Sequence, residues 1–561
     1  MPKYSHFDTF YHAPERGQAW HAVALIWATW GVYFAWLWPR LWFQDGGGIF
    51  AGHRSVAEAW PAHSALASVF AYREPGAWFL GNPQAAGEPL GGGFVADALA
   101  GFLILAGFDH GLALMVTALA YTFLFLAALV LFCRAALDRT GRAWIAATLF
   151  LCAGGLGFTH YLDGLIQPLL GADPSWTAFG HNLLSLPARE YTLMPERGLV
   201  LGNPVTALLL GQRDLLLGMT LALGLLAILL DWYRNGFEHV GALASAAMGI
   251  ALGLLAAVNG ASLAVCAVVV LLMVLGAPGA WRHWFLIGLL ALAVSLPLLQ
   301  LLHGDLDRLW RALAWRPGGQ TELQPADQRP WWLYWWDNRG LFLPLAAAGL
   351  LVNRWWGQPV ALAGVVLFAL VNLVQLRPAL EENAVFLAWA QLLLALPLAH
   401  LLGELRRVVP FGAIPALLLT LALIGSGALD LWRAAGTREG LQRIWGPAEL
   451  ALAEQLRQLS APTDLVLVAP TRRTWVSGLT GRPQVVGDES RLQQAGVVTG
   501  NLELAVNKAV ETGRLEGVDS AAAGGVRWVV TDAATAGRLL QARRFASVAE
   551  HRDTVILSVR P

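Results

Sequence analysis

The chain is poor in charge, and the few charges it has balance one another. Only 14% of its 561 residues are Asp, Glu, Lys or Arg, with 38 basic and 38 acidic side chains. Nucleic-acid binding needs a basic patch or an excess of positive charge. We therefore expect no nucleic-acid partner. Lysine in particular is almost missing, since Lys3 and Lys508 are the only two.

Cysteine and sequence motifs for metals are scarce as well. Cys133, Cys152 and Cys266 all fall inside apolar runs, which is typical of small core residues and not of a disulfide framework. The chain has no HExxH or CxxC motif and no Gly-rich phosphate loop. We assign no metal-binding residues, and the cofactor stays unknown, with a divalent metal as an option that no motif supports.

What the chain has in abundance is hydrophobic sequence. Hydrophobic residues make up 56% of it, and the mean hydropathy is +0.53. These values predict an α-helical polytopic membrane protein. A helix needs about 20 apolar residues to cross a bilayer. Eleven segments are candidate spans: 20–42, 111–133, 143–160, 213–232, 239–257, 260–277, 284–303, 340–353, 359–376, 384–402 and 411–433.

Arginines in the short loops predict the orientation, because loops on the cytoplasmic side are enriched in basic residues. Placing the N-terminus in the cytoplasm puts the short basic loops there. Residues 93–107 would reverse this order if they crossed, so we expect a half-helix at the outer interface. The richness in Ala, Gly, Leu and Arg suggests a bacterium, hence its inner (plasma) membrane. The arginines concerned are Arg134, Arg139, Arg142, Arg234, Arg282, Arg354, Arg406 and Arg407.

Two regions follow from this threading. Residues 1–433 form a transmembrane domain with a large first outer loop at 43–110. Residues 434–561 are polar enough to form a small soluble α/β domain outside the cytoplasm. Within it TDLVLVAP, VRWVVTD and TVILSV predict short buried strands, and AELALAEQLRQL predicts a helix.

The first outer loop holds several carboxylates that could do chemistry. Asp45 directly follows the first span, and Glu58 lies five residues before His63 in a predicted helix. A carboxylate at a membrane surface can act as a general base on a hydroxyl or hold a metal ion. Asp45 and Glu58 are our catalytic candidates. His63 and Glu88 are better explained as ordinary loop residues, and we keep both as supporting candidates.

The stretch GQRD interrupts a long apolar run with Gln212, Arg213 and Asp214. The preceding segment 199–212 is broken by residues 202–204 (Gly-Asn-Pro), so it is not expected to cross. Arg213 would then face an outer cavity at headgroup depth, where its planar fork of donors suits a phosphate. The alternatives are an Arg213–Asp214 ion pair and snorkelling to the interface.

Five stretches give the chain a family resemblance. They are SVAEAWPAHSALASVFAY, NPQAAGEPLGGGFVADAL, MPERGLVLGNPVTALLLGQRDLLLG, WWLYWWDNRGLFLPL and LTGRPQVVGD. With its span number and its large first loop, the chain resembles the GT-C superfamily of integral-membrane glycosyltransferases. The resemblance implies a GT-C-like helical bundle, often with a C-terminal outer domain, that uses a lipid-linked sugar donor.

By that resemblance, Glu58 or Asp45 would be the catalytic base and Arg213, with Gln212, would hold the donor phosphate. Related sequences carry an Asp directly before the Trp of EAWPAH, where this chain has Ala59. They also carry a Lys where Val385 stands. The supporting residues would be His63, Glu88, Asp97, Arg189 and Asp214, of which Asp97 also suits the first turn of a helix.

We therefore expect a glycosyltransferase that moves a sugar from a polyprenyl-phosphate donor to an acceptor hydroxyl, with inversion at the sugar. Its partners would be the lipid-linked sugar donor and membrane lipids. Two alternatives remain: a transporter or flippase of lipid-linked glycans, and a non-catalytic scaffold for envelope assembly. The two departures at Ala59 and Val385 keep the scaffold open.

Overall fold

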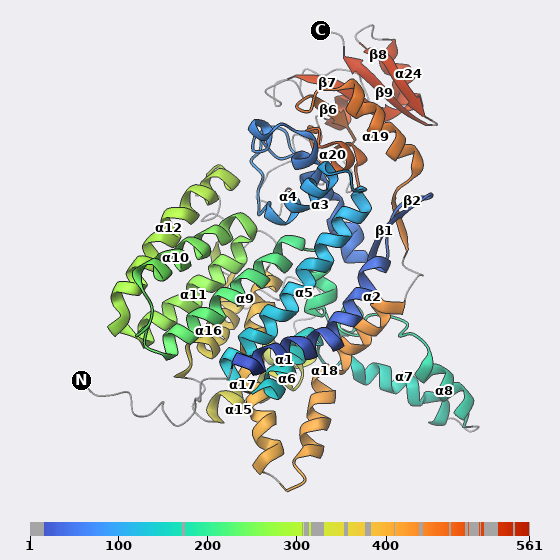
Figure 1. The fold of residues 1–561 in the computed structure, drawn as a ribbon. Coiled ribbons are helices and arrows are strands. Elements are labelled where there is room, and N and C mark those ends of the chain that lie inside the picture. The colour runs from blue at the N-terminus through green and yellow to red at the C-terminus, as the bar shows by residue number, and fades with distance from the viewer. Residues whose placement is uncertain are drawn as a thin grey trace.

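The structure is a computed structural model, and its helices and strands are shown in Figure 1. It describes residues 16–137, 139–170, 174–305, 307, 313–315, 330–352, 357–375, 383–408, 410–436, 441–469, 473–487, 492, 504, 506–509, 525–541, 545–551 and 553–559. Within these residues the chain forms a large helical bundle with a small α/β region at one end. We call the side of the bundle that carries this region the domain face.

Within the described ranges, six helical stretches are long and apolar enough to cross a membrane. All six coincide with expected spans, and the chain is therefore a multi-pass membrane protein. The first stretch is continuous over α1, a π-helical turn η1 and α2. The elements are α1 Arg16–Ile26, η1 Trp27–Gly31, α2 Val32–Leu41, α5 His110–Leu137, α9 Arg213–Arg234, α12 Trp281–His303, α17 Asn383–Val408 and α18 Ala413–Gly436.

Shorter apolar helices of 10–17 residues overlap four more of the expected spans and the expected half-helix. The half-helix is α4, whose 11 residues are too few to cross a bilayer. These helices are α4 Val95–Leu105, α10 Ala242–Val258, α11 Gly260–Gly276, α15 Phe342–Leu351 and α16 Pro359–Leu373.

The expected span at 143–160 is wrong. Helix α6 (Thr140–Leu151) ends after 12 residues, and the chain turns at Gly154 and Gly155 before a new helix starts at Phe158. A Cβ on Gly155 would lie 2.3 Å from the backbone oxygen of Asp337, so only glycine permits this close approach. The turn is therefore fixed by tertiary packing that hydropathy does not register.

Short helices and turns connect the longer helices of the bundle. Some of them lie on the domain face, and others lie beside the bundle. Helices α7 and α8 project sideways from the bundle (Figure 1). The expected helix at 54–71 is confirmed as α3, which packs against α4 and α20. These elements are α3 Arg54–Tyr72, η2 Pro75–Ala77, α7 Phe158–Leu170, α8 Trp176–Leu184, η3 Pro195–Arg197, η4 Val205–Leu209, η5 Pro278–Ala280 and α14 Trp331–Arg339.

The three strands expected near the C-terminus are confirmed, and a fourth joins them. The sheet order is β6-β7-β9-β8, with β6 parallel to β7 and the other pairs antiparallel. The expected helix is α19. These elements are α19 Pro447–Leu459, β6 Leu465–Val468, α20 Trp475–Thr480, β7 Val526–Asp532, α24 Ala533–Leu540, β8 Phe545–His551 and β9 Thr554–Val559.

Two smaller sheets join segments that are far apart in sequence. Strands β1 (Trp42–Asp45) and β2 (Gly48–Ala51) form a hairpin, and β5 (Gln442–Trp445) pairs with β2 to complete a three-stranded sheet. The other pairs β3 (Ala314–Trp315) with β4 (Val374–Gln375). The C-terminal region is thus hydrogen-bonded directly to the first loop.

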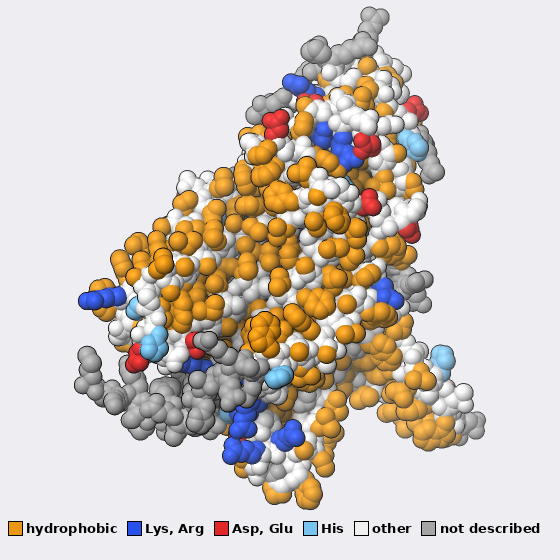
Figure 2. All heavy atoms as spheres, viewed as in Figure 1, with side chains coloured by type: hydrophobic (Ala, Val, Ile, Leu, Met, Phe, Trp, Pro, Cys, Tyr) orange, Lys and Arg blue, Asp and Glu red, His pale blue; other side chains and the backbone are white. Residues whose placement is uncertain are grey.

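The distribution of side chains fits a membrane bundle. Figure 2 shows hydrophobic side chains over the middle of the bundle, with charged side chains mainly toward its two ends. Helix α17 lies at the centre, with 94% of its most apolar window buried, whereas that share is 17% for the stretch containing α12. The bundle therefore has one deeply enclosed helix and an outer layer that faces lipid.

Candidate functional site

The N-terminus of α3 lies on the domain face and is capped by His53. His53 has extended backbone angles, and its Nδ1 accepts a hydrogen bond from the backbone N–H of Ser55 at 3.2 Å. Because Nδ1 accepts, the ring proton is on Nε2. Nε2 donates to Oε1 of Glu190 at 3.0 Å. This contact ties the first loop to the segment that follows α8.

Glu190 is partly enclosed, with 28% of its side chain exposed. Burial alone would raise the pKa of this carboxyl, but the hydrogen bond from His53 and the nearby charges of Arg433 and Arg54 outweigh it. The pKa of Glu190 therefore lies below its usual value, and the group is ionised at neutral pH. Of the two neighbouring charges in ARE, only Arg189 was expected among the supporting residues, and Glu190 was given no role.

The segment 187–204 around Glu190 is held from two further sides. Asp430 of α18 accepts hydrogen bonds from the backbone N–H groups of Tyr191 at 2.5 Å and Thr192 at 3.2 Å, and from the Thr192 hydroxyl. Asn338 of α14 accepts from the backbone N–H groups of residues 200 and 201 at 2.8 and 3.0 Å. Helices α3, α14 and α18 therefore meet at this one segment, which gives it a defined shape.

Arg339 follows Asn338 at the end of α14 and is a buried cation for which the described part of the chain offers no counter-charge. Its side chain is 5% exposed, and its hydrogen bond within this part is a long one, from Nη1 to the backbone oxygen of Asn338 at 3.4 Å. Nε has no partner, and no carboxylate within the described ranges pairs with the guanidinium. Burial lowers the pKa of Arg339 to about 10.

An uncompensated buried charge costs several kcal/mol, so it marks either strain or a place for an anion. Arg339 is next to Asn338, which anchors the 187–204 segment. Glu190, the partner of His53, lies on that segment. We call His53, Glu58 and Glu190 the domain-face cluster, and we consider Arg339 with them because Asn338 links it to the same segment. Arg339 was not among the residues expected from the sequence, although WWLYWWDNRG places an arginine directly after an aromatic run, which offered a signal.

The structure corrects the expectation for Arg213, which does not face a cavity. Its side chain is 1% exposed, and its N–H groups donate hydrogen bonds to groups inside the bundle. Nε donates to Asp97 at 3.2 Å, Nη1 to the backbone oxygen of Leu114 at 2.6 Å, and Nη2 to Thr117 Oγ1 at 2.7 Å. The ring of Trp60 lies 5.1 Å away. A guanidinium with these partners is not free to hold a lipid phosphate.

His63 and Asp97 belong to the same buried network. Asp97 is fully buried in the first turn of α4, as expected, and its Oδ2 lies 2.8 Å from Nδ1 of His63. His63 is 4% exposed, so its interpretation as an ordinary loop residue is wrong. Asp97 thus compensates Arg213 and orients His63, and the three side chains join α3, α4 and α9.

The remaining candidates are dispersed. Glu58 accepts from Arg54 at 2.8 Å one turn into α3, and it is 38% exposed. Asp45 is exposed in the β1–β2 turn, where its Oδ1 accepts from the backbone N–H of Gly47 at 2.7 Å. Of the expected catalytic pair, only Glu58 shares the start of α3 with the His53–Glu190 contact.

The supporting candidates have local roles. Arg189 forms an exposed pair with Glu196 at 2.7 Å, and Asp214 accepts from Asn259 at 2.9 Å instead of pairing with Arg213. Gln212 caps the start of α9 without a side-chain hydrogen bond, and the Glu88 backbone closes a turn with residues 82 and 85. Within the described residues no three His, Cys, Asp or Glu side chains are grouped to hold a metal ion.

Comparisons with known proteins identify the fold. No protein-family model and no curated protein matches the chain. The oligosaccharyltransferase of Archaeoglobus fulgidus, solved in complex with zinc and sulfate, is similar with a TM-score of 0.50 and 15% identity, over 94% of this chain and 71% of that one. ArnT from Cupriavidus metallidurans, bound to undecaprenyl phosphate, matches with a TM-score of 0.47 and 12% identity, over 97% and 98%.

At these identities the likeness concerns the fold. The helical bundle with its C-terminal α/β region is the GT-C fold, and the resemblance drawn from the sequence is confirmed at that level. The roles of individual residues stay predictions.

The buried network makes a prediction about stability. Replacing Arg213 with Met leaves Asp97 as an uncompensated buried carboxylate, which should cost about 3–5 kcal/mol. The melting temperature of the purified protein should fall strongly, whereas Arg189→Met, at an exposed pair, should leave it unchanged. An Arg213→Met variant with a normal melting temperature and no activity would instead favour a role in binding the donor.

The His53–Glu190 contact makes a prediction about pH. The pKa of Glu190 is depressed in the folded state, so the stability it contributes is present above the unfolded-state carboxyl pKa. That stability is lost as pH falls through the depressed folded-state pKa. Thermal unfolding measured from pH 7 down to pH 3 should therefore show a smaller acid loss in Glu190→Gln than in the wild type. Parallel curves for the two proteins would contradict the contact.

Proposed function

We propose that the protein is a membrane glycosyltransferase, which moves a sugar from a polyprenyl-phosphate donor to an acceptor hydroxyl at the domain face. The observation that carries this proposal is Arg339, a buried guanidinium that pairs with no carboxylate of the described residues, on a GT-C fold. A donor phosphate would supply the missing negative charge. This role passes to Arg339 from Arg213, whose donors are occupied.

The reaction would be a direct displacement. The acceptor oxygen attacks the anomeric carbon as a carboxylate takes its proton, and the bond from that carbon to the phosphate oxygen breaks. Polyprenyl phosphate leaves, and the sugar configuration inverts. Arg339 would stabilise the negative charge that grows on the leaving phosphate, in a site where water is excluded and such a contact is strong.

Glu58 is the better of the two expected bases. It lies one turn into α3, whose N-terminus is tied through His53 to Glu190, and it is accessible enough to meet an acceptor. Asp45 lies on a turn of the β1–β2 hairpin, away from that contact, and is kept as the alternative. Glu190, ionised and bonded to His53, would position the start of α3 without touching the substrate.

The donor-phosphate role can be tested with matched variants. We expect Arg339→Met to weaken binding of undecaprenyl phosphate roughly ten- to a hundred-fold, the value of a charge-assisted hydrogen bond pair. Arg189→Met removes the same charge from an exposed pair and should bind normally. Titration of each purified protein with undecaprenyl phosphate measures this, and equal affinities would sink the assignment.

Turnover is tested in washed membranes, which supply the acceptor, with a panel of labelled undecaprenyl-phosphate sugars. We expect Glu58→Gln to lower transfer about 100-fold or more, as for loss of a general base, while Asp45→Asn and the exposed control Glu196→Gln keep it. If Asp45→Asn alone loses transfer, the base is Asp45. Wild type that binds the carrier and transfers no sugar would favour the flippase or the scaffold.

We further propose that the domain face lies outside the cytoplasm, because the basic short loops would then lie inside. In fusions made after Pro561, alkaline phosphatase should therefore be active, and green fluorescent protein should not fluoresce. The reverse pattern would place the domain face in the cytoplasm and remove the proposed donor site from the outer leaflet.

A further inference from the structure

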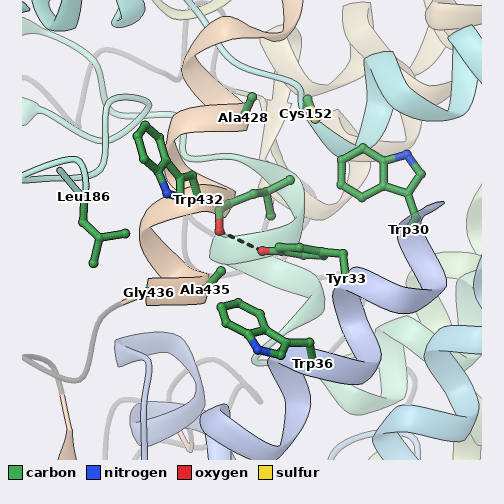
Figure 3. A pocket seen from close by; sticks show the side chains of 10 residues that line it. Trp30, Tyr33, Trp36, Cys152, Leu186, Ala428, Trp432, Ala435 and Gly436 are labelled. Carbon is green, nitrogen blue, oxygen red and sulfur yellow. Dashed lines mark hydrogen bonds between the residues drawn. The ribbon is translucent and has the colours of Figure 1, made fainter. Parts of the chain in front are cut away.

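A groove opens between the first membrane stretch and α18. Its volume is about 480 Å³. Figure 3 shows aromatic side chains from η1 and α2 facing small residues of α18. The Tyr33 hydroxyl is used, since it donates to the backbone oxygen of Leu431 at 2.8 Å. The residues that line the groove include Trp30, Tyr33, Trp36, Ala428, Trp432 and Ala435.

Both walls of the groove face the bilayer. Only 39% of the first stretch and 33% of α18 are buried in their most apolar windows, against 94% for the central helix α17. Outside these walls the surrounding medium is lipid, so the groove has hydrocarbon chains as neighbours. An apolar groove in this position is filled by a chain, because a void would forfeit dispersion contacts.

Arg40 lies beside the groove, at the end of α2. Its guanidinium carbon is 4.0 Å from the ring centre of Trp36, a lining residue, and its Nη1 donates to the backbone oxygen of Trp36 at 2.6 Å. The side chain is exposed, and no carboxylate in the described part of the chain pairs with it. Its other donors are available to an anion outside.

We propose that this groove is a binding site for an anionic phospholipid of the leaflet on the domain face. One acyl chain would lie against the three tryptophans, and the phosphate would rest on Arg40. A net negative headgroup fits because Arg40 brings a positive charge that no acidic side chain offsets. The inference does not depend on the transferase activity.

The length of the groove favours an acyl chain over a long isoprenoid chain. From Trp30 to Trp36 the helix advances six residues, or roughly 9 Å at 1.5 Å per residue. A leaflet of a hydrocarbon core about 30 Å thick measures roughly 15 Å. The groove therefore accommodates the upper part of one chain, and an acyl chain that ends within one leaflet leaves less of its length outside the groove than a long polyprenyl chain does.

The bound lipid would brace α18. This helix carries Asp430, which holds residues 191 and 192, and Arg433, whose Nη1 donates to the backbone oxygen of Pro187 at 2.5 Å. A chain that fills the gap beside α18 would stiffen these anchors. Binding in the groove would then be felt at the 187–204 segment although the lipid does not touch it.

The test measures lipid binding on the purified, delipidated full chain. Phosphatidylglycerol is the probe, read by native mass spectrometry and by the melting temperature. We expect it to bind and to raise the melting temperature, and phosphatidylethanolamine to bind more weakly. Arg40→Gln should weaken phosphatidylglycerol binding about five-fold, the effect of one basic residue at a membrane surface. Arg282→Gln is the matched control, since Arg282 is also exposed over a tryptophan, Trp281, at 5.6 Å.

Filling the groove is the second arm of the test. Ala428→Phe places a ring where the acyl chain would lie, and it should abolish the thermal shift while the protein remains monodisperse. Three results would overturn the proposal: unchanged phosphatidylglycerol binding in Arg40→Gln, equal binding of both phospholipids, or displacement of phosphatidylglycerol by equimolar undecaprenyl phosphate. The last would assign the groove to the carrier lipid, which would then also bind there in the Arg339→Met protein.

Discussion

A charge inside this bundle has to be met by another charge or by a full set of hydrogen bonds. The Arg213–Asp97–His63 network shows the rule at work, because one guanidinium with 1% exposure draws together α3, α4, α5 and α9. In a low-dielectric interior each broken contact would leave a polar group stranded. The half-helix α4 is thus held in the bundle by an ion pair as well as by apolar packing.

The same rule gives Arg339 its meaning. Arg213 and Arg339 are both buried, yet Arg213 is bonded through all three of its nitrogens, whereas Arg339 has an unpartnered Nε and one long hydrogen bond within the described residues. The ion pair and hydrogen bonds of Arg213 account for its burial as a structural feature. The other arginine has a cost that nothing within the described residues offsets, so it points to a ligand. Arg339 is therefore identified as the candidate by this difference in partners from Arg213, and not simply because it is an arginine.

Much of the fold follows from the sequence, because long apolar runs and period-two strands are local signals. The six long stretches and the strands β6, β7 and β9 were predictable in this way. The span at 143–160 was not, because the turn at Gly155 depends on the backbone of Asp337, far along the chain.

The site was less predictable than the fold for a similar reason. Arg213 looked exposed since its partner Asp97 is 116 residues away, and the isolation of Arg339 is a property of its surroundings alone. Glu190 was overlooked because its partner His53 lies 137 residues away, on α3. Sequence spacing shows which residues could form a site, whereas only the folded structure shows which of them are already bonded to other residues.

The pairing of β5 with β2 has a consequence for biogenesis. Hairpin β1–β2 emerges early in synthesis, but the strand that completes its sheet begins at Gln442, after the last long helix. Until the ribosome has delivered that strand, β2 offers an open edge on which foreign strands could pair. The early loop therefore has to wait for nearly the whole bundle to be inserted, which makes closure of this small sheet a late checkpoint of assembly.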